Sequence, residues 1–133
     1  MKWTKKEKDF VDTARVARLA TVDANGNAYN VPICPLLDGD KIYFATEAAA
    51  KKVRNIKINP RVTLVFDEYT EAWDRLCGIM IRGRARLVDA REFRRLRRRF
   101  YAKYLRYESA APLEVGDSAI VEVTPENKFG WGL

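Results

Sequence analysis

One stretch of the chain combines residues that can bind an anion with the start of a predicted helix. Thr46 ends a short apolar run, alanines fill 48–50, and Lys51 and Lys52 then open a basic helical segment. The first turn of a helix has backbone N–H groups without intrahelical partners and the positive end of the helix dipole, so it stabilises a nearby anion. The stretch therefore predicts a phosphate-binding site. The alternative is an ordinary connection with two solvated lysines.

The chain contains no histidine. Histidine is the commonest general base and a usual zinc ligand, it activates serine and cysteine nucleophiles, and it ligates haem. Cys34 and Cys77 lie among apolar residues without metal-type spacing, so we expect two buried small side chains and no metal site. Any chemistry must rest on a cofactor, on carboxylates, or on lysine and tyrosine.

The positive charge of the chain is concentrated in one segment. Residues 89–107 hold eight basic and two acidic residues, a net +6, so the rest of the chain carries only +1 of the total +7. We expect this segment to be an amphipathic helix with a solvated basic face, and we do not expect nucleic-acid binding. A basic face that binds phosphates is the alternative.

Length and hydropathy favour one domain spanning residues 1–133. No segment approaches the roughly 20 apolar residues that cross a membrane, and the charged N-terminus lacks the apolar segment of a secretory signal. We therefore expect a cytoplasmic protein with no membrane association.

The periodicity of the chain predicts six strands and three helices that would position these residues. The helices are expected at 5–16, after Lys51 as far as Asn59–Pro60, and from Asp89 to Tyr107. The predicted strands are 18–23, 28–37, 41–45, 61–67, 76–88 and 118–124. Pro32 and Pro35 favour an edge or bulged position for the second strand. The pattern predicts a closed or nearly closed antiparallel barrel with peripheral helices, with an open α+β sheet as the alternative.

Segments in a fixed order along the chain carry a family resemblance. They are Arg18 to Asp23, Asp38 to Asp40, Ile42 to Thr46, Lys51 to Ile56, Asn59 to Val62 and Ile81 to Leu87. Together they resemble the pyridoxamine 5'-phosphate oxidase-like flavin-binding split barrels over nearly the whole chain. The resemblance implies a mainly β fold with peripheral helices, a six-stranded antiparallel split β-barrel. It also implies a homodimer that binds FMN, or alternatively the deazaflavin F420, at two equivalent sites on the subunit interface.

The resemblance also implies which residues contact the cofactor. In the family, an arginine of the first strand and a Thr-x4-Arg-Lys stretch hold the phosphate. The expected cofactor-binding residues are Arg18, Ala20, Ala45, Thr46, Lys51, Lys52 and Trp131. The chain departs from the family pattern at three positions. Ala50 stands where a serine is usual, Lys51 replaces an arginine, and Gly78 aligns with a glutamine that touches the flavin.

These features predict an oxidoreductase that transfers hydride to or from a small organic substrate and needs no catalytic side chain, because the cofactor carries the chemistry. We expect neither true pyridoxamine phosphate oxidase activity nor haem handling, since both use histidine in this family. The backbone of Val31 to Ile33 is a predicted neighbour of the cofactor ring. Tyr69, Trp73 and Asp74 are predicted to line a substrate pocket or, in the case of Trp73, to anchor a dimer. The alternative is a cofactor-free dimeric split barrel that binds partners through the basic helix 89–107.

Overall fold

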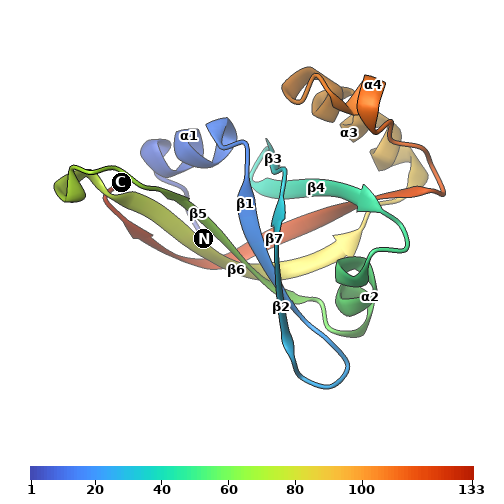
Figure 1. The fold of residues 1–133 in the computed structure, drawn as a ribbon, viewed down its shortest axis with the longest axis horizontal. Coiled ribbons are helices and arrows are strands. Elements are labelled where there is room, and N and C mark those ends of the chain that lie inside the picture. The colour runs from blue at the N-terminus through green and yellow to red at the C-terminus, as the bar shows by residue number, and fades with distance from the viewer.

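A single antiparallel sheet of seven strands organises the structure, a computed structural model that describes all residues 1–133. The strand order is β2-β1-β5-β6-β7-β4-β3, and the helices lie around the sheet (Figure 1). The strands are β1 (Ala17–Val22), β2 (Ala28–Ile33), β3 (Leu36–Asp38), β4 (Lys41–Glu47), β5 (Arg61–Glu68), β6 (Cys77–Leu87) and β7 (Ser118–Trp131). The helices are α1 (Lys5–Thr13), α2 (Lys51–Ile58), α3 (Ala90–Lys103) and α4 (Tyr107–Ala110), with a 3-10 turn η1 (Trp73–Arg75).

The predicted count of six strands is wrong because the second predicted strand is two strands. Cys34 and Pro35 interrupt it, so that β2 forms one edge of the sheet and β3 the other. Pro32 is tolerated because β2 lies at an edge, as the sequence predicted. Two residues can join opposite edges only if the edges approach each other, so the sheet is curled into a half-barrel. No strand pairing closes it between β2 and β3.

Two cores lie on opposite faces of the curled sheet. The larger core of 16 buried residues fills the inside of the curl and includes Ile42 and Phe44 of β4. The smaller core of eight buried residues lies between α3 and the outer face, and it includes Tyr43 together with Phe93 and Phe100. Because successive side chains of a strand point to opposite faces, β4 contributes to both cores. The apolar face predicted for the long helix is thereby confirmed.

Several predicted boundaries differ from the observed ones. The capping box of Thr4 and Glu7 is present, but α1 ends at Thr13 because the chain is already extended at Ala14 on its way into β1. The helix predicted over 89–107 breaks at Tyr104, where the backbone is extended, and restarts as the short α4. Strand β7 continues to Trp131, well beyond the predicted end at 124, because it pairs with the full length of β6.

Other predictions concern single residues. A bulge lies between Arg82 and Gly83, and the position of Gly83 has no room for a Cβ beside Thr124. Both cysteines are free and half-buried, whereas the sequence predicted two buried side chains. None of the helices has the length and apolar character needed to cross a bilayer.

A buried carboxylate joins the sheet to α3. Glu122 of β7 is only 3% exposed and accepts hydrogen bonds from the Tyr43 hydroxyl at 3.0 Å, from Arg86 at 2.9 Å and from Lys41 at 3.3 Å. Arg86 also contacts Glu92 of α3 at 3.1 Å. Burial alone would raise the pKa of Glu122, but hydrogen bonds from Arg86, Tyr43 and Lys41 together hold it below its ordinary value of 4.5. Glu122 is therefore ionised and fully hydrogen-bonded at neutral pH.

We expect Glu122→Ala to lower the free energy of unfolding by about 2 kcal/mol, because the buried Tyr43 hydroxyl loses its acceptor. Chemical denaturation at neutral pH measures this loss. Because the folded pKa is lowered, the contribution of Glu122 is present above pH 4.5 and is lost as the pH falls through the folded pKa. Glu122→Gln should therefore lose less stability than the wild type as the pH is lowered below 4.5. An identical pH dependence in the two proteins would contradict this account.

Candidate functional site

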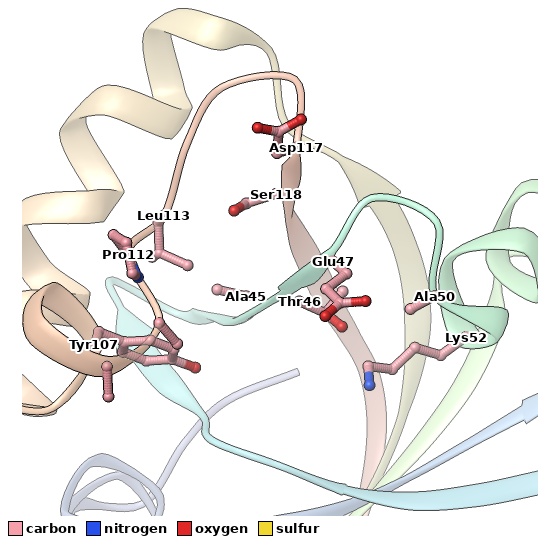
Figure 2. Close-up of a pocket in the computed structure, with 12 residues that line it drawn as sticks. Ala45, Thr46, Glu47, Ala50, Lys52, Tyr107, Pro112, Leu113, Asp117 and Ser118 are labelled. Carbon is pink, nitrogen blue, oxygen red and sulfur yellow. The ribbon is translucent and has the colours of Figure 1, made fainter.

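A cleft of about 670 Å³ lies between the end of β4, the start of α2 and the segment that leads from α4 into β7. Figure 2 shows Tyr107, Pro112 and Leu113 on one side of the cleft and Ala50 and Lys52 on the other. Its lining residues are Ala45, Thr46, Glu47, Ala50, Lys52, Tyr107, Ala110, Ala111, Pro112, Leu113, Asp117 and Ser118.

A smaller cavity of about 240 Å³ adjoins the cleft. It is lined by Val16, Pro32, Ile33, Cys34, Ala45, Lys52 and Tyr107. Ala45, Lys52 and Tyr107 line both spaces, so the cleft and the cavity are neighbours that share one wall. Its other residues come from the segment before β1 and from the end of β2, and most of them are apolar. The curl of the sheet creates this meeting of β2 with β4.

Helix α2 presents an uncapped start to the cleft. Its N-cap residue is Ala50, which offers no side-chain hydrogen bond to the first turn. The buried Asn55 amide donates to the Thr21 hydroxyl at 3.0 Å and so fastens the helix to β1. Lys52 is half-buried at the cleft wall and forms no ion pair. This end of the helix therefore has free anion-binding capacity.

The two lysines predicted to act together point to different surroundings. The Lys51 ammonium lies 5.1 Å from the centre of the Tyr29 ring, in a cation–π contact with the β1–β2 hairpin. Lys51 is exposed and lines neither the cleft nor the smaller cavity. The structure therefore brings Thr46, Ala45 and Lys52 together, and it leaves Lys51 outside that group.

Arg18 and Ala20 lie on the outer face of β1. Cross-strand partners in an antiparallel pair point to the same face, and Arg18 is opposite Pro32, which lines the smaller cavity. Arg18 thus lies one strand away from the cavity wall, on the same face. Ala20 lines a different hollow of about 240 Å³ on this face, beside Arg61 and Arg82.

Trp131 lies at the far end of β7 from Ser118, which lines the cleft (Figure 1). It pairs with Gly78 of β6, and its indole ring covers that glycine. Trp131 therefore does not meet the cleft residues of its own chain.

The loop from 69 to 75 is also remote from the cleft, at the opposite end of β5 from α2 (Figure 1). Tyr69 and Trp73 are 67% and 71% exposed, and the Trp73 indole donates to the Tyr69 hydroxyl at 3.3 Å. This loop therefore does not line the cleft of its own chain, and its place at a substrate pocket stays a prediction. A role for Trp73 in a dimer stays a prediction.

Sequence reasoning missed three polar groups of the cleft. Asp117 and Ser118 enter it because β7 begins beside the end of β4, a pairing that no local pattern reveals. The sequence predicts one continuous helix ending at Tyr107, but the break after Lys103 lets the Tyr107 side chain line the cleft. The sequence held one signal of this break. In a continuous helix Leu105, a large apolar residue, would lie off the apolar face. In the structure Leu105 is 81% exposed.

The basic helix uses part of its charge inside the fold. Arg95 and Arg99 both bind Asp38, at 2.5 Å and 3.1 Å, and Arg97 and Lys103 donate to backbone carbonyls at 3.2 Å and 2.9 Å. The remaining arginines of the segment have no hydrogen-bond or ion-pair partner; they are Arg91, Arg94, Arg98 and Arg106. The basic face is therefore smaller than the composition indicates.

A family model described as pyridoxamine 5'-phosphate oxidase matches residues 3–132. The chain belongs to the pyridoxamine 5'-phosphate oxidase-like split-barrel family. No curated protein matches the sequence directly.

Solved structures share the fold of this chain at low sequence identity. The heme storage protein HutZ from Vibrio cholerae has a TM-score of 0.80 and 18% identity, over 97% of this chain and 94% of its own. A FAD-binding protein from Mesorhizobium loti has a TM-score of 0.76 and 20% identity, over 96% and 94% of the two chains.

A protein of unknown function from Agrobacterium tumefaciens has a TM-score of 0.80 and 20% identity, over 94% of this chain. This chain spans about half of that relative's length, since the match covers 55% of it. At these identities the three likenesses establish the split-barrel fold. Proteins with this fold thus include one named for heme storage and one named for FAD binding.

Gly78, which the family resemblance places at the position of a flavin-contacting glutamine, has no room for a side chain. The Trp131 ring fills the space that any side chain at 78 would need. The Phe66 carbonyl oxygen would lie only 2.7 Å from a Cβ at the same position. Glycine at position 78 is therefore required by the placement of Trp131.

We expect Gly78→Ala to lower the free energy of unfolding by about 1–3 kcal/mol, because the new methyl group overlaps the Trp131 ring. The same substitution made in a Trp131→Ala background should cost clearly less, since the larger of the two obstacles is gone. Urea denaturation of the four proteins measures both effects. Equal costs in the two backgrounds would show that the ring does not restrict position 78.

Proposed function

We propose that this family member is an oxidoreductase that binds FMN, or alternatively F420, and transfers hydride to or from a small organic molecule. The cofactor phosphate would lie at the start of α2, against Thr46 and Lys52, with its ring toward the smaller cavity. Membership of a family known for flavin enzymes supports the class of function. The observation that carries the proposal is Lys52, a half-buried cation with no ion pair beside an uncapped helix start.

The residues of the cleft fit a phosphate. Lys52 supplies a full positive charge, and the first backbone N–H groups of α2 supply donors that no side chain caps. Glu47 and Asp117 also line the cleft, but both are exposed, so solvent screens their repulsion of an anion. The loss of the usual serine at Ala50 removes one hydrogen bond without blocking the helix start.

A flavin or deazaflavin ring is a better candidate than a haem for the smaller cavity. Its wall includes Pro32 and Ile33, within the segment predicted to neighbour the ring. A chain without histidine lacks the usual axial ligand of haem iron, although HutZ is named a heme storage protein. When bound, a flavin or deazaflavin accepts or donates the hydride. The residues of the chain would bind and orient the cofactor.

We further propose that two copies form a homodimer with the cofactor at their interface. Val65, Met80 and Phe129 are register partners on three adjacent strands and point to the outer face of the sheet. Phe129 is 64% exposed, and such an apolar sheet face is typical of an interface. Arg18, Ala20 and Trp131, which lie away from the cleft of their own chain, would then contact the cofactor through this assembly.

We expect Lys52→Ala to weaken FMN binding at least tenfold, because a hydrogen-bonded charge on the phosphate is worth about 1.5–3 kcal/mol. Lys51→Ala is the matched control, since Lys51 contacts Tyr29 and not the cleft, and it should change the Kd by less than threefold. Quenching of flavin fluorescence measures both, and deazaflavin fluorescence does so for F420. Failure of the wild type to bind either cofactor would contradict the proposal.

One observation favours a second candidate function, a binding module that acts through α3. Arg91, Arg94 and Arg98 are exposed, have no partner, and recur at the spacing of one helix face. A helix rises 1.5 Å per residue, so the three side chains span about 10 Å, enough to contact several phosphates of one strand.

For this second candidate, the affinity for single-stranded RNA should fall as the salt concentration rises. The slope of log K against the logarithm of the salt concentration should be about −2 for three phosphate contacts. Replacing Arg91, Arg94 and Arg98 by Gln should abolish that slope. The matched control replaces Lys2, Lys6 and Lys57, which removes the same charge elsewhere. Fluorescence anisotropy at several salt concentrations measures the slopes. Equal effects of the two triple variants would show that RNA binding depends on the overall charge of the protein and not on α3.

A further inference from the structure

Tyr107 occupies the boundary between the two spaces of the candidate site. It is one of three residues that line both the cleft and the smaller cavity. Figure 2 shows its hydroxyl pointing into the cleft, toward the side that carries Thr46 and Lys52. A ligand that extended from the start of α2 into the smaller cavity would pass this hydroxyl.

The ring of Tyr107 is held in place although α4 is only four residues long. It makes edge-to-face contacts with Phe100 at 5.9 Å and with Tyr104 at 5.8 Å, both close to perpendicular. Phe100 is fully buried, and the Tyr104 hydroxyl donates to the Pro35 carbonyl at 2.6 Å. The neighbours of Tyr107 are therefore themselves fixed, and the hydroxyl has a defined position.

The other tyrosines around α3 use their hydroxyls within the fold. Tyr43 donates to Glu122 at 3.0 Å, Tyr104 donates to Pro35, and the Tyr101 oxygen accepts from the Leu113 amide at 2.9 Å. Tyr107 has no such partner; only the thiol of Cys34, a weak hydrogen-bonding group, lies beside it. Its donor is therefore available to a ligand.

The protonation state of Tyr107 suits a donor. Burial, with a smaller contribution from Cys34, raises the pKa of Tyr107 to about 12. The hydroxyl thus keeps its proton at neutral pH.

We propose that Tyr107 is a cofactor-binding residue that donates a hydrogen bond to the ring system of the bound flavin or deazaflavin. This inference rests on the proposed function. The ring carries carbonyl oxygens and ring nitrogens at its edge, which are hydrogen-bond acceptors. The site then divides recognition between two residues, because Lys52 selects the phosphate and Tyr107 selects the ring.

A comparison of FMN with riboflavin tests this division, because riboflavin has the same ring without the phosphate. Tyr107→Phe keeps the packed ring and removes only the hydroxyl. It should raise the Kd of FMN and of riboflavin equally, by about fivefold, and leave their ratio unchanged. Lys52→Ala should instead weaken the binding of FMN but not of riboflavin, so that the two Kd values become similar. If F420 is the cofactor that binds, F420 and its phosphate-free deazariboflavin form the corresponding pair.

Tyr43→Phe is the matched control, since its hydroxyl donates to Glu122 and lines neither the cleft nor the smaller cavity. It should leave both Kd values unchanged. As a second readout, Tyr107→Phe should shift the midpoint potential of the bound cofactor, which a loss of packing alone would not do.

If the wild type binds the cofactor, and Tyr107→Phe has the same Kd values and the same midpoint potential as the wild type, the role of Tyr107 is overturned. The proposed function would still stand. Failure of the wild type to bind FMN, riboflavin or F420 would overturn both. A change in the FMN-to-riboflavin ratio in Tyr107→Phe would also contradict the division, because it would assign Tyr107 to the phosphate.

Discussion

The fold depends on a two-residue link. Cys34 and Pro35 join β2 to β3, which are the opposite edges of the seven-stranded sheet. A link this short requires the edges to approach each other, so the sheet curls around its core. The same curl brings the end of β2 beside the end of β4, and the candidate site lies where they meet. A longer connection would permit a flatter sheet, with Pro32 and Ala45 on separate surfaces.

Charged residues fix the outer layer on this curled sheet. Glu122 connects β4, β6 and β7 and reaches α3 through Arg86, while Asp38 holds two arginines of α3. The charge of the helix therefore serves the fold first, and only part of it is free. Because α3 is held in this way, the chain beyond its end forms one wall of the cleft, and Tyr107 belongs to that wall.

The candidate site combines parts that are distant in the sequence and differ in kind. The start of α2 offers a cation and uncapped N–H groups, the end of β2 offers an apolar wall, and α4 offers a phenol donor. A molecule with an anionic end and a flat ring matches this order. The outer face that carries Arg18 and Phe129 is exposed on one chain, and the proposed second copy would cover it.

The sequence by itself determined the family and the mainly β class, because both depend on the order of segments along the chain. The anion-binding character of the segment around Thr46 and Lys52 stays a prediction. The tertiary structure decided that Lys52 lines the cleft and Lys51 does not, since the β1–β2 hairpin supplies the Tyr29 ring that Lys51 contacts. The extension of β7 to Trp131 also depended on the tertiary structure, since β7 pairs with β6 as far as Gly78. The break before Tyr107 is likewise seen only in the structure. Local patterns report which residues favour a helix or strand. They do not report which distant strand end lies opposite, and that contact decides which side chains form a site.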